Sequence, residues 1–211
     1  MRYQDNHQRS SFSSRERKPV ILILVEGNDN KTEKQYFLEF NTQKSKYSII
    51  VECPGDTDFP GLLSALKRSI SENQLDFELG DKAFIVADLD CSKDKIDYLS
   101  KLNEEDYSRF IISNPCFEVW FINHFRYTTH AFLSSKEAID YLKRDLPNYS
   151  KNFSKNRNTR LELENLISKV PLAIDNTKKQ LEHFNSTGVL WPNVHCNPYT
   201  GVISVMETIL E

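Results

Sequence analysis

The sequence predicts an α/β fold, with a parallel β-sheet core, helices on both of its faces and a helical C-terminal elaboration. Two short apolar runs, residues 20–25 and 83–87, carry this prediction. Each run lacks polar alternation and is too short for a core helix, which is typical of a strand buried on both faces. Segments with helical spacing of apolar residues separate the strands, and this alternation favours parallel pairing.

The expected elements follow one another along the chain. Strands are expected at residues 20–25, 47–53, 83–87 and 107–112. Helices are expected from Thr32 onward, at 59–73, 93–102, 115–125, 135–146 and 160–184 with an interruption at Pro171, and after Asn197-Pro198. Asn30 is the expected N-cap of the first helix, and Asn114 that of the helix beginning at Pro115.

Composition indicates a globular chain with three parts. The 211 residues carry a net charge of −3 and are 39% hydrophobic. Residues 1–18 form a polar segment, read as a disordered tail or, alternatively, a nucleic-acid arm. Residues 19–130 form the α/β core, and residues 131–211 form a helical region packed on it. No apolar stretch approaches the roughly 20 residues of a membrane span, so we expect a cytoplasmic protein with no membrane partner.

Three acids follow predicted strands and suggest a metal site. Glu26 follows the first strand, and Asp88 and Asp90 end a later one. The carboxyl ends of parallel strands meet at one edge, where ligands bind, and alternation along a strand would turn Asp88 and Asp90 to the same side. Three crowded carboxylates repel one another unless a cation lies between them. The sequence therefore predicts a site for Mg²⁺ or Mn²⁺.

Four further residues have both a structural and a functional interpretation. Glu33 can close a capping box or support the metal site. Gly27 fits an ordinary tight turn, and its lack of a side chain also lets the backbone approach a phosphate. Glu118 in the first turn of a helix can serve the helix dipole or a metal. His124 lies on an aromatic face, where it can be a hydrogen-bonded core residue or a ligand.

A basic stretch at residues 148–160 is the candidate nucleic-acid-binding segment. It carries Lys151, Lys155, Arg157 and Arg160 without an acid, interleaved with the aromatic residues Tyr149 and Phe153. Positive charge with aromatic side chains suits phosphate contacts and base stacking. A solvated loop is the alternative.

The motifs also resemble known families. Val25-Glu26-Gly27, Thr32-Glu33 and Asp88-x-Asp90 are similar to the Toprim domain of topoisomerases, primases and OLD-type nucleases. A wider set of motifs resembles the RloB (AbiLii-type) family, which is associated with restriction loci and abortive phage defence. These motifs are Glu26-Gly27, Thr32-Glu33-x-x-Tyr36-Phe37, Asp88-x-Asp90, Asn114-Pro115-x-Phe117-Glu118-x-Trp120-Phe121-x-x-His124-Phe125 and Asn197-Pro198-Tyr199-Thr200.

The resemblance implies a Toprim-like nuclease that cuts RNA, tRNA among the candidates, or DNA, with a partner protein from a defence system. It implies Glu26 as general base or metal ligand, Asp88 and Asp90 as metal ligands, and Glu33 and Glu118 as supporting or second-metal residues. Two other functions remain open. One is a haloacid-dehalogenase-like phosphatase with Asp88 as nucleophile and Asp90 as acid/base. The other is a subunit that binds nucleic acid or protein without catalysis.

Overall fold

A computed structural model describes residues 17–26, 32–55, 58–149 and 157–211, with only the backbone for residues 157–160. Its centre is a five-stranded sheet of order β2-β1-β3-β4-β5. The strands are β1 (Val20–Val25), β2 (Ser48–Glu52), β3 (Lys82–Asp88), β4 (Phe110–Asn114) and β5 (Tyr199–Thr200). Strands β1 to β4 pair in parallel, which confirms the predicted α/β class. Strand β5 pairs antiparallel with β4 and was not expected.

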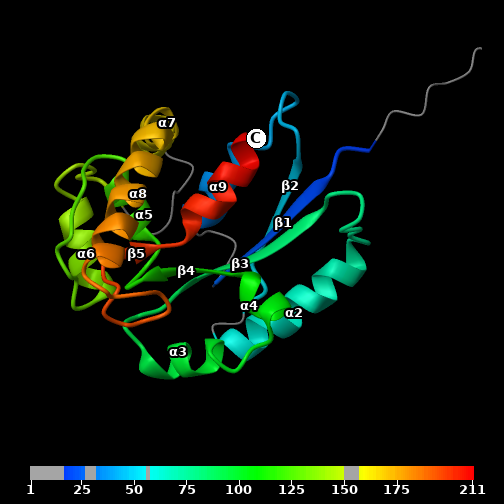
Figure 1. Ribbon diagram of the computed structural model, residues 1–211. Coiled ribbons are helices and arrows are strands. Elements are labelled where there is room, and N and C mark those ends of the chain that lie inside the picture. The colour runs from blue at the N-terminus through cyan, green and yellow to red at the C-terminus, as the bar shows by residue number, and fades with distance from the viewer. Residues whose placement is uncertain (1–16, 27–31, 56–57, 150–156) are drawn as a thin grey trace, which may run out of the picture.

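Helices alternate with the first four strands and then dominate the chain (Figure 1). They are α1 (Thr32–Leu38), α2 (Phe59–Glu72), α3 (Lys93–Leu99), α4 (Glu104–Ser108), α5 (Glu118–Asn123), α6 (Ser135–Leu142), α7 (Arg157–Ser168), α8 (Val170–Ser186) and α9 (Val202–Leu210). None of the helices in these described parts of the chain has the length and apolar character needed to cross a membrane.

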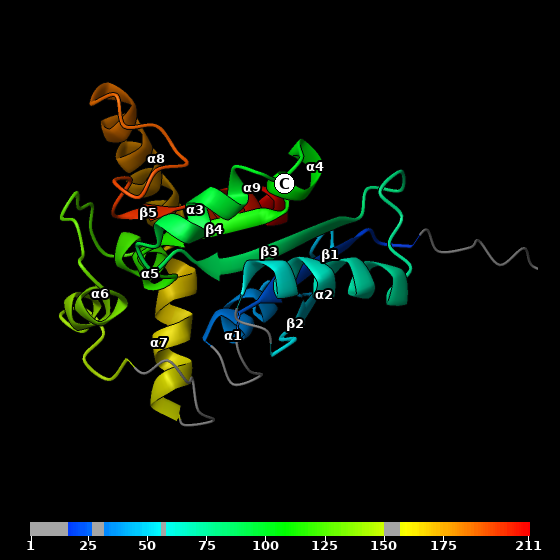
Figure 2. The same ribbon diagram turned by 90° about the horizontal axis from the view of Figure 1, so that it is seen from below.

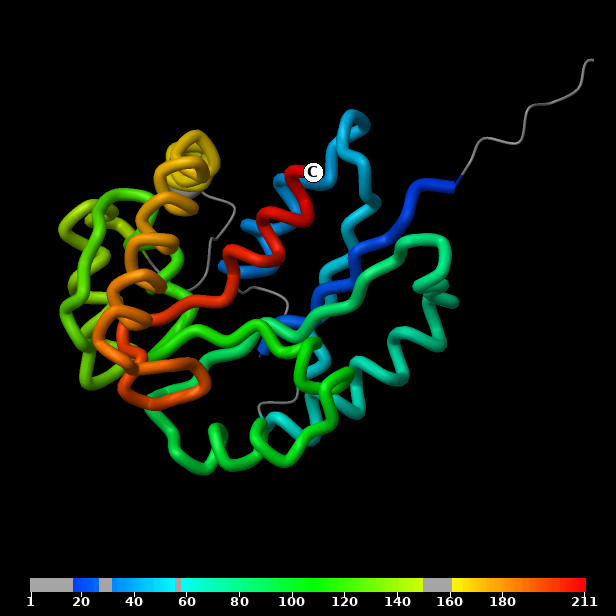
Figure 3. The backbone as a smooth tube through the Cα atoms, viewed as in Figure 1, coloured from blue at the N-terminus to red at the C-terminus, as the bar shows by residue number. Residues whose placement is uncertain are grey.

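Both faces of the sheet are covered, because the strands are apolar on both sides. In β1, Ile21 and Ile23 join one core cluster, while Leu22 and Leu24 join another. Helices α1 and α9 pack on the first face, and α2 and α3 lie across the sheet from them (Figure 3). The continuous apolar run of β1 is thus explained by its central, doubly covered position.

The remaining helices gather at one end of the sheet. Helices α5, α6, α7 and α8 lie on the side toward which the arrow of β3 points (Figure 2). Buried polar side chains join α5 to α8: Asn123 Nδ2 donates to Thr177 Oγ1 at 2.9 Å and to Gln180 Oε1 at 2.8 Å. The helical part of the chain therefore packs beside the carboxyl ends of the parallel strands.

Several predicted boundaries were wrong for local reasons. Strand β4 begins at Phe110 rather than at residue 107, because Asn103 caps the short helix α4 by accepting from the Asp106 amide at 2.8 Å. Asn114 does not cap a helix. Helix α5 begins at Glu118 with no side-chain cap, and Asn114 ends β4. The predicted interruption at Pro171 is confirmed, with α8 beginning at Val170.

The N-terminal segment is described only from Arg17 onward, so most of the predicted tail, residues 1–18, lies outside the described residues. Lys18 Nζ donates to the carbonyl oxygens of Gln43 at 2.7 Å and Ser45 at 2.8 Å. Arg17 pairs with the buried Asp81. These contacts fix the chain where it enters β1.

Candidate active site

Glu26 and Asp88 lie together at the carboxyl ends of two adjacent strands. Strands β1 and β3 pair in parallel with Val25 opposite Val86, so Glu26 directly after β1 and Asp88 at the end of β3 lie at the same end of the sheet. The amide of Asp88 donates to Glu26 Oε2 over 3.4 Å. Asp88 Oδ1 in turn accepts from the amide of Phe117 at 2.8 Å, just before α5. The structure thus brings two of the three predicted acids into one place.

Asp90 is oriented differently, because β3 ends at Asp88 and the backbone turns. Asp90 and Cys91 have φ values of 55° and 56°, in the left-handed region that non-glycine residues rarely adopt. Strand alternation therefore does not relate Asp90 to Asp88, and that part of the prediction was wrong. The Asp90 carboxylate instead accepts from Lys95 Nζ at 2.8 Å and from Ser135 Oγ at 3.2 Å.

The turn after β3 is held by Asn114, whose side chain is completely buried. Its Oδ1 accepts from the Cys91 amide at 3.2 Å. Its Nδ2 donates to the carbonyl oxygens of Val194 at 3.0 Å and Cys196 at 2.8 Å. The side-chain amide of Asn114 therefore connects the turn after β3, the acidic turn, with the segment that leads into β5. The two residues with positive φ are uncommon and persist only where surrounding contacts define them.

Glu118 and Glu33 belong to a second group, around Tyr149. Glu118 is buried, and its Oε1 accepts from the Tyr149 hydroxyl at 2.9 Å. Burial raises the pKa of Tyr149 well above its ordinary value, and the charges of Glu118 and then Glu33 raise this pKa further. Glu118 directly follows Phe117, whose amide holds Asp88, so the two acidic groups meet at the start of α5.

His124 is completely buried among aromatic side chains. The carbonyl of Trp120 lies 2.8 Å from Nδ1 and can only accept, so Nδ1 carries the proton. Nε2 then accepts from the Tyr36 hydroxyl at 3.1 Å. Burial lowers the pKa of His124 to about 4, so the ring is neutral at pH 7. The contacts of His124 are those of a core residue that joins α1 to α5.

The remaining sequence candidates are only partly described. Gly27, Lys151 and Lys155 lie outside the described residues. Arg157 and Arg160 lie in α7, of which only the backbone is described at these positions. The end of the predicted basic loop is therefore helical. Tyr149 was predicted as an aromatic residue available for base stacking, but only 4% of it is exposed, so its ring cannot stack on a base in this structure.

Sequence reasoning missed Lys95 and Ser135 and named Asn197 only as part of a motif, although all three residues contact this region. Asn197 Nδ2 donates to the Phe132 carbonyl at 2.7 Å and lies 3.5 Å from Cys91 Sγ. A usable signal existed for Lys95. Ser92 caps α3 by accepting from the Lys95 amide, which fixes Lys95 in the first turn, five residues after Asp90.

The donor chemistry at this edge fits a hard divalent cation. In the described parts of the chain, no group of three or more His, Cys, Asp or Glu side chains has an arrangement that could hold a metal ion. Mg²⁺ does not require such a cage. It is commonly held by one or two carboxylates together with water and substrate phosphate oxygens. Glu26 and Asp88 supply that number of carboxylates.

Comparison with protein families gives one match. A family model described as RloB-like protein matches residues 21–209, from the start of β1 to the end of α9. Comparisons with curated proteins and with solved structures gave no match.

Proposed function

This chain belongs to the RloB-like family, and we propose that it is a metal-dependent nuclease of Toprim type that cleaves phosphodiester bonds in RNA or DNA. The observation that carries the proposal is the meeting of Glu26 and Asp88 at the carboxyl ends of β1 and β3, where the Asp88 amide donates to Glu26. In open α/β sheets this edge is where ligands bind. Two adjacent carboxylates at such an edge suit phosphate chemistry better than a structural role.

In this proposal Glu26 and Asp88 hold Mg²⁺ or Mn²⁺, with Glu26 as candidate general base. The bound ion supplies neutralisation of the scissile phosphate and a more acidic water. The amide of Phe117 fixes one oxygen of Asp88 and so orients this carboxylate. Glu118 and Glu33, gathered around Tyr149, add negative charge close to the same helix start.

The substrate and setting follow from the family resemblance. A role in anti-phage defence, tRNA as one RNA target, DNA as the alternative, and a partner protein from the same defence system are parts of the proposal. Lys151, Lys155, Arg157 and Arg160 are proposed to contact phosphates of the substrate. Family membership supports these parts, and they require direct tests.

The test is cleavage of labelled RNA and DNA by the purified chain with Mg²⁺ or Mn²⁺, alongside sequencing of RNA and DNA ends from expressing cells. Wild type is expected to cut, and EDTA, Glu26→Gln and Asp88→Asn are expected to abolish cutting. Asp106→Asn on helix α4 is the matched control, because it removes one carboxylate charge away from the sheet edge. Cleavage that persists in excess chelator would overturn the proposal.

Two further experiments test the alternatives. A phosphatase would form a phosphoenzyme on Asp88, which acid-quenched reactions with a labelled phosphate ester can trap. A binding subunit would retain its biological effect in Glu26→Gln. Either result would replace the nuclease proposal.

A further inference from the structure

Lys95 reaches from the first turn of α3 back to the end of β3. Its ammonium donates to the carbonyl oxygen of Asp88 at 2.6 Å and to Asp90 Oδ2 at 2.8 Å. The same group lies 5.0 Å from the centre of the Phe59 ring, a cation–π arrangement. Only 20% of the Lys95 side chain is exposed. A positive charge is therefore fixed between the two residues that the Asp88-x-Asp90 motif would assign to metal binding.

Both carboxylate oxygens of Asp90 are engaged by the protein. Lys95 donates to Oδ2, and Ser135 Oγ donates to Oδ1 at 3.2 Å. Asp90 thereby links the end of β3 to α3 and to the first residue of α6. Lys95 already compensates the charge of Asp90, so a metal ion that bound this carboxylate would lie close to an ammonium group that repels it.

The turn that Asp90 stabilises also controls the position of Asp88. The Asp90 amide donates to the Pro115 carbonyl at 2.9 Å. Two residues after Pro115, the amide of Phe117 donates to Asp88 Oδ1. The turn and the segment that orients the Asp88 carboxylate are thus fastened to each other. A shift of this turn would move the donor that orients Asp88.

We propose that Asp90 is a positioning residue, paired with Lys95, and that a metal ion at this edge is held by Glu26 and Asp88. This inference rests on the proposed metal-dependent function and deepens it. It separates the roles of the two aspartates, whereas the family resemblance treats both as ligands. Lys95 serves as the internal cation that compensates Asp90 and fixes the turn.

The first experiment is titration of the metal-free full-length protein with Mn²⁺ by calorimetry. Asparagine at position 90 still accepts from Lys95 through its carbonyl oxygen and can donate through its amide nitrogen to Ser135 Oγ, and it tolerates positive φ well. We therefore expect Asp90→Asn to bind Mn²⁺ within about fivefold of wild type, and Asp88→Asn to bind at least 30-fold more weakly. An Asp90→Asn variant that loses as much affinity as Asp88→Asn would overturn the inference.

The second experiment needs no metal and measures amide hydrogen exchange by NMR. The amides of Asp90 and Cys91 donate from the turn to Pro115 and Asn114, so they report whether the turn is held in place. Lys95→Met is expected to speed their exchange at least tenfold, and Lys95→Arg to keep it near wild type. Ile23, in the middle of β1, is the control amide. Unchanged exchange at the turn, or equal acceleration at Ile23, would overturn the positioning role.

The two experiments also separate this inference from the proposed function. If wild type binds no Mn²⁺ and no Mg²⁺, the metal-dependent function fails, and the assignment of ligands fails with it. The exchange data would still decide whether Lys95 and Asp90 fix the turn. If wild type binds Mn²⁺ but Lys95→Met does not change amide exchange at the turn, only the positioning role of Asp90 and Lys95 fails.

Discussion

The turn after β3 and the surface formed by α2 and α4 are both built from polar side chains, but their contacts span different distances along the chain. At the turn, Asp88 contacts Phe117, Asp90 contacts Ser135, and Asn114 contacts Cys196. Each of these contacts joins segments that lie far apart in the sequence. Their partners come from different elements.

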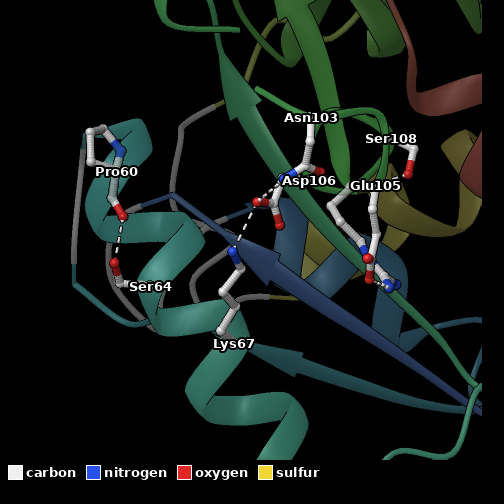
Figure 4. A network of polar contacts seen from close by, with 8 residues as sticks. Pro60, Ser64, Lys67, Asn103, Glu105, Asp106 and Ser108 are labelled. Atoms are coloured by element: carbon white, nitrogen blue, oxygen red, sulfur yellow. Dashed lines mark hydrogen bonds and ion pairs between the residues drawn. The ribbon is translucent and has the colours of Figure 1, made fainter. Parts of the chain in front are cut away.

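On the α2–α4 surface most contacts are local (Figure 4). Ser64 Oγ donates to the Pro60 carbonyl at 2.9 Å, and Ser108 Oγ donates to the Glu105 carbonyl at 2.7 Å. The contact between the two helices is the ion pair of Lys67 with Asp106 at 2.9 Å. More than half of the Lys67 side chain is exposed.

The comparison shows two uses of polar contacts. Those on the α2–α4 surface stabilise single elements, whereas those at the turn after β3 position the side chains of the site. A local cap stabilises one helix and an exposed ion pair contributes little, so losing either has a small effect on the rest of the fold. The contact of Asp90 with Ser135 is exposed, but those of Asp88 and Asn114 are partly or wholly buried and connect several segments. Losing one of them leaves polar groups unsatisfied and frees the acids it positions.

The largest difference between the two regions is expected for loss of an asparagine. Asn114→Ala removes three hydrogen bonds and leaves the Cys91 amide and the carbonyls of Val194 and Cys196 without their partner. We expect a loss of about 4 kcal/mol in the free energy of unfolding. Asn103→Ala, which removes the cap of α4, is expected to cost about 1 kcal/mol.

Urea unfolding of the two variants measures this difference. Both variants replace asparagine with alanine. They therefore differ only in how deeply the asparagine is buried and in how far apart along the sequence its partners lie. Equal losses in the two variants would mean that the contacts of Asn114 contribute no more than a surface cap.

The next effect concerns metal binding. Mg²⁺ at a hundredfold excess over its Kd should stabilise wild type by about 2.7 kcal/mol, because it binds the folded state and not the unfolded chain. Asp88→Asn should keep or raise the metal-free melting temperature, since it relieves repulsion with Glu26, and should lose the response to Mg²⁺. Asp106→Asn should keep that response.

Melting curves of the three proteins with and without Mg²⁺ provide the measurement. A lower metal-free melting temperature for Asp88→Asn with an unchanged Mg²⁺ response would indicate that Asp88 serves the fold alone.

The sequence predicted the fold where the signals were local. The apolar run of β1, the helical spacing of apolar residues at 59–73 and the interruption at Pro171 all act within a few residues, and the structure confirms the elements that they mark. Strand β5 has only two residues, too few for a pattern of its own, and it forms because β4 offers an edge.

The site was harder to predict, because its geometry depends on contacts across the chain. The meeting of Glu26 and Asp88 followed from parallel pairing alone. The orientation of Asp90 did not, since Ser135 lies 45 positions later and the left-handed turn has no glycine to mark it. Asn114 looked like a helix cap because the residue after it is proline. Its partners, the carbonyl oxygens of Val194 and Cys196, could not be predicted from that local signal.

A smaller effect is expected from acidification. It acts through His124, whose buried hydrogen bond with Tyr36 also joins distant parts of the sequence. The folded-state pKa of His124, about 4, lies below the ordinary 6.5, so the unfolded chain takes up the proton first. The contribution of neutral His124 to the free energy of unfolding is therefore fully present above about pH 6.5 and falls as pH decreases toward 4. At about 1.4 kcal/mol per pH unit, roughly 2 kcal/mol is lost by pH 5.

Urea unfolding of wild type and His124→Gln at pH 7 and pH 5 tests this dependence. The variant is less stable at both values, because it loses the contacts with Tyr36 and Trp120. Its stability should change less with pH than that of wild type, by about the His124 contribution. An identical pH dependence in the two proteins would exclude His124 as its source.

The smallest effect is expected for the pair of Lys67 and Asp106. The hydrogen bond from Lys67 lowers the pKa of Asp106, with a further contribution from Asn103, against the opposing effect of burial. The pair therefore stabilises the fold above the ordinary Asp pKa, and this contribution is lost as pH falls through the lowered folded value. Because Lys67 is 58% exposed, water screens the pair, and Lys67→Met should cost less than about 1 kcal/mol.

In 1 M NaCl, where the screening length is about 3 Å, wild type and Lys67→Met should become nearly equal in stability. Urea unfolding at low and high salt measures both values. A loss comparable to that of Asn114→Ala, or one that salt does not reduce, would show that this surface pair contributes as much as the contacts at the acidic turn.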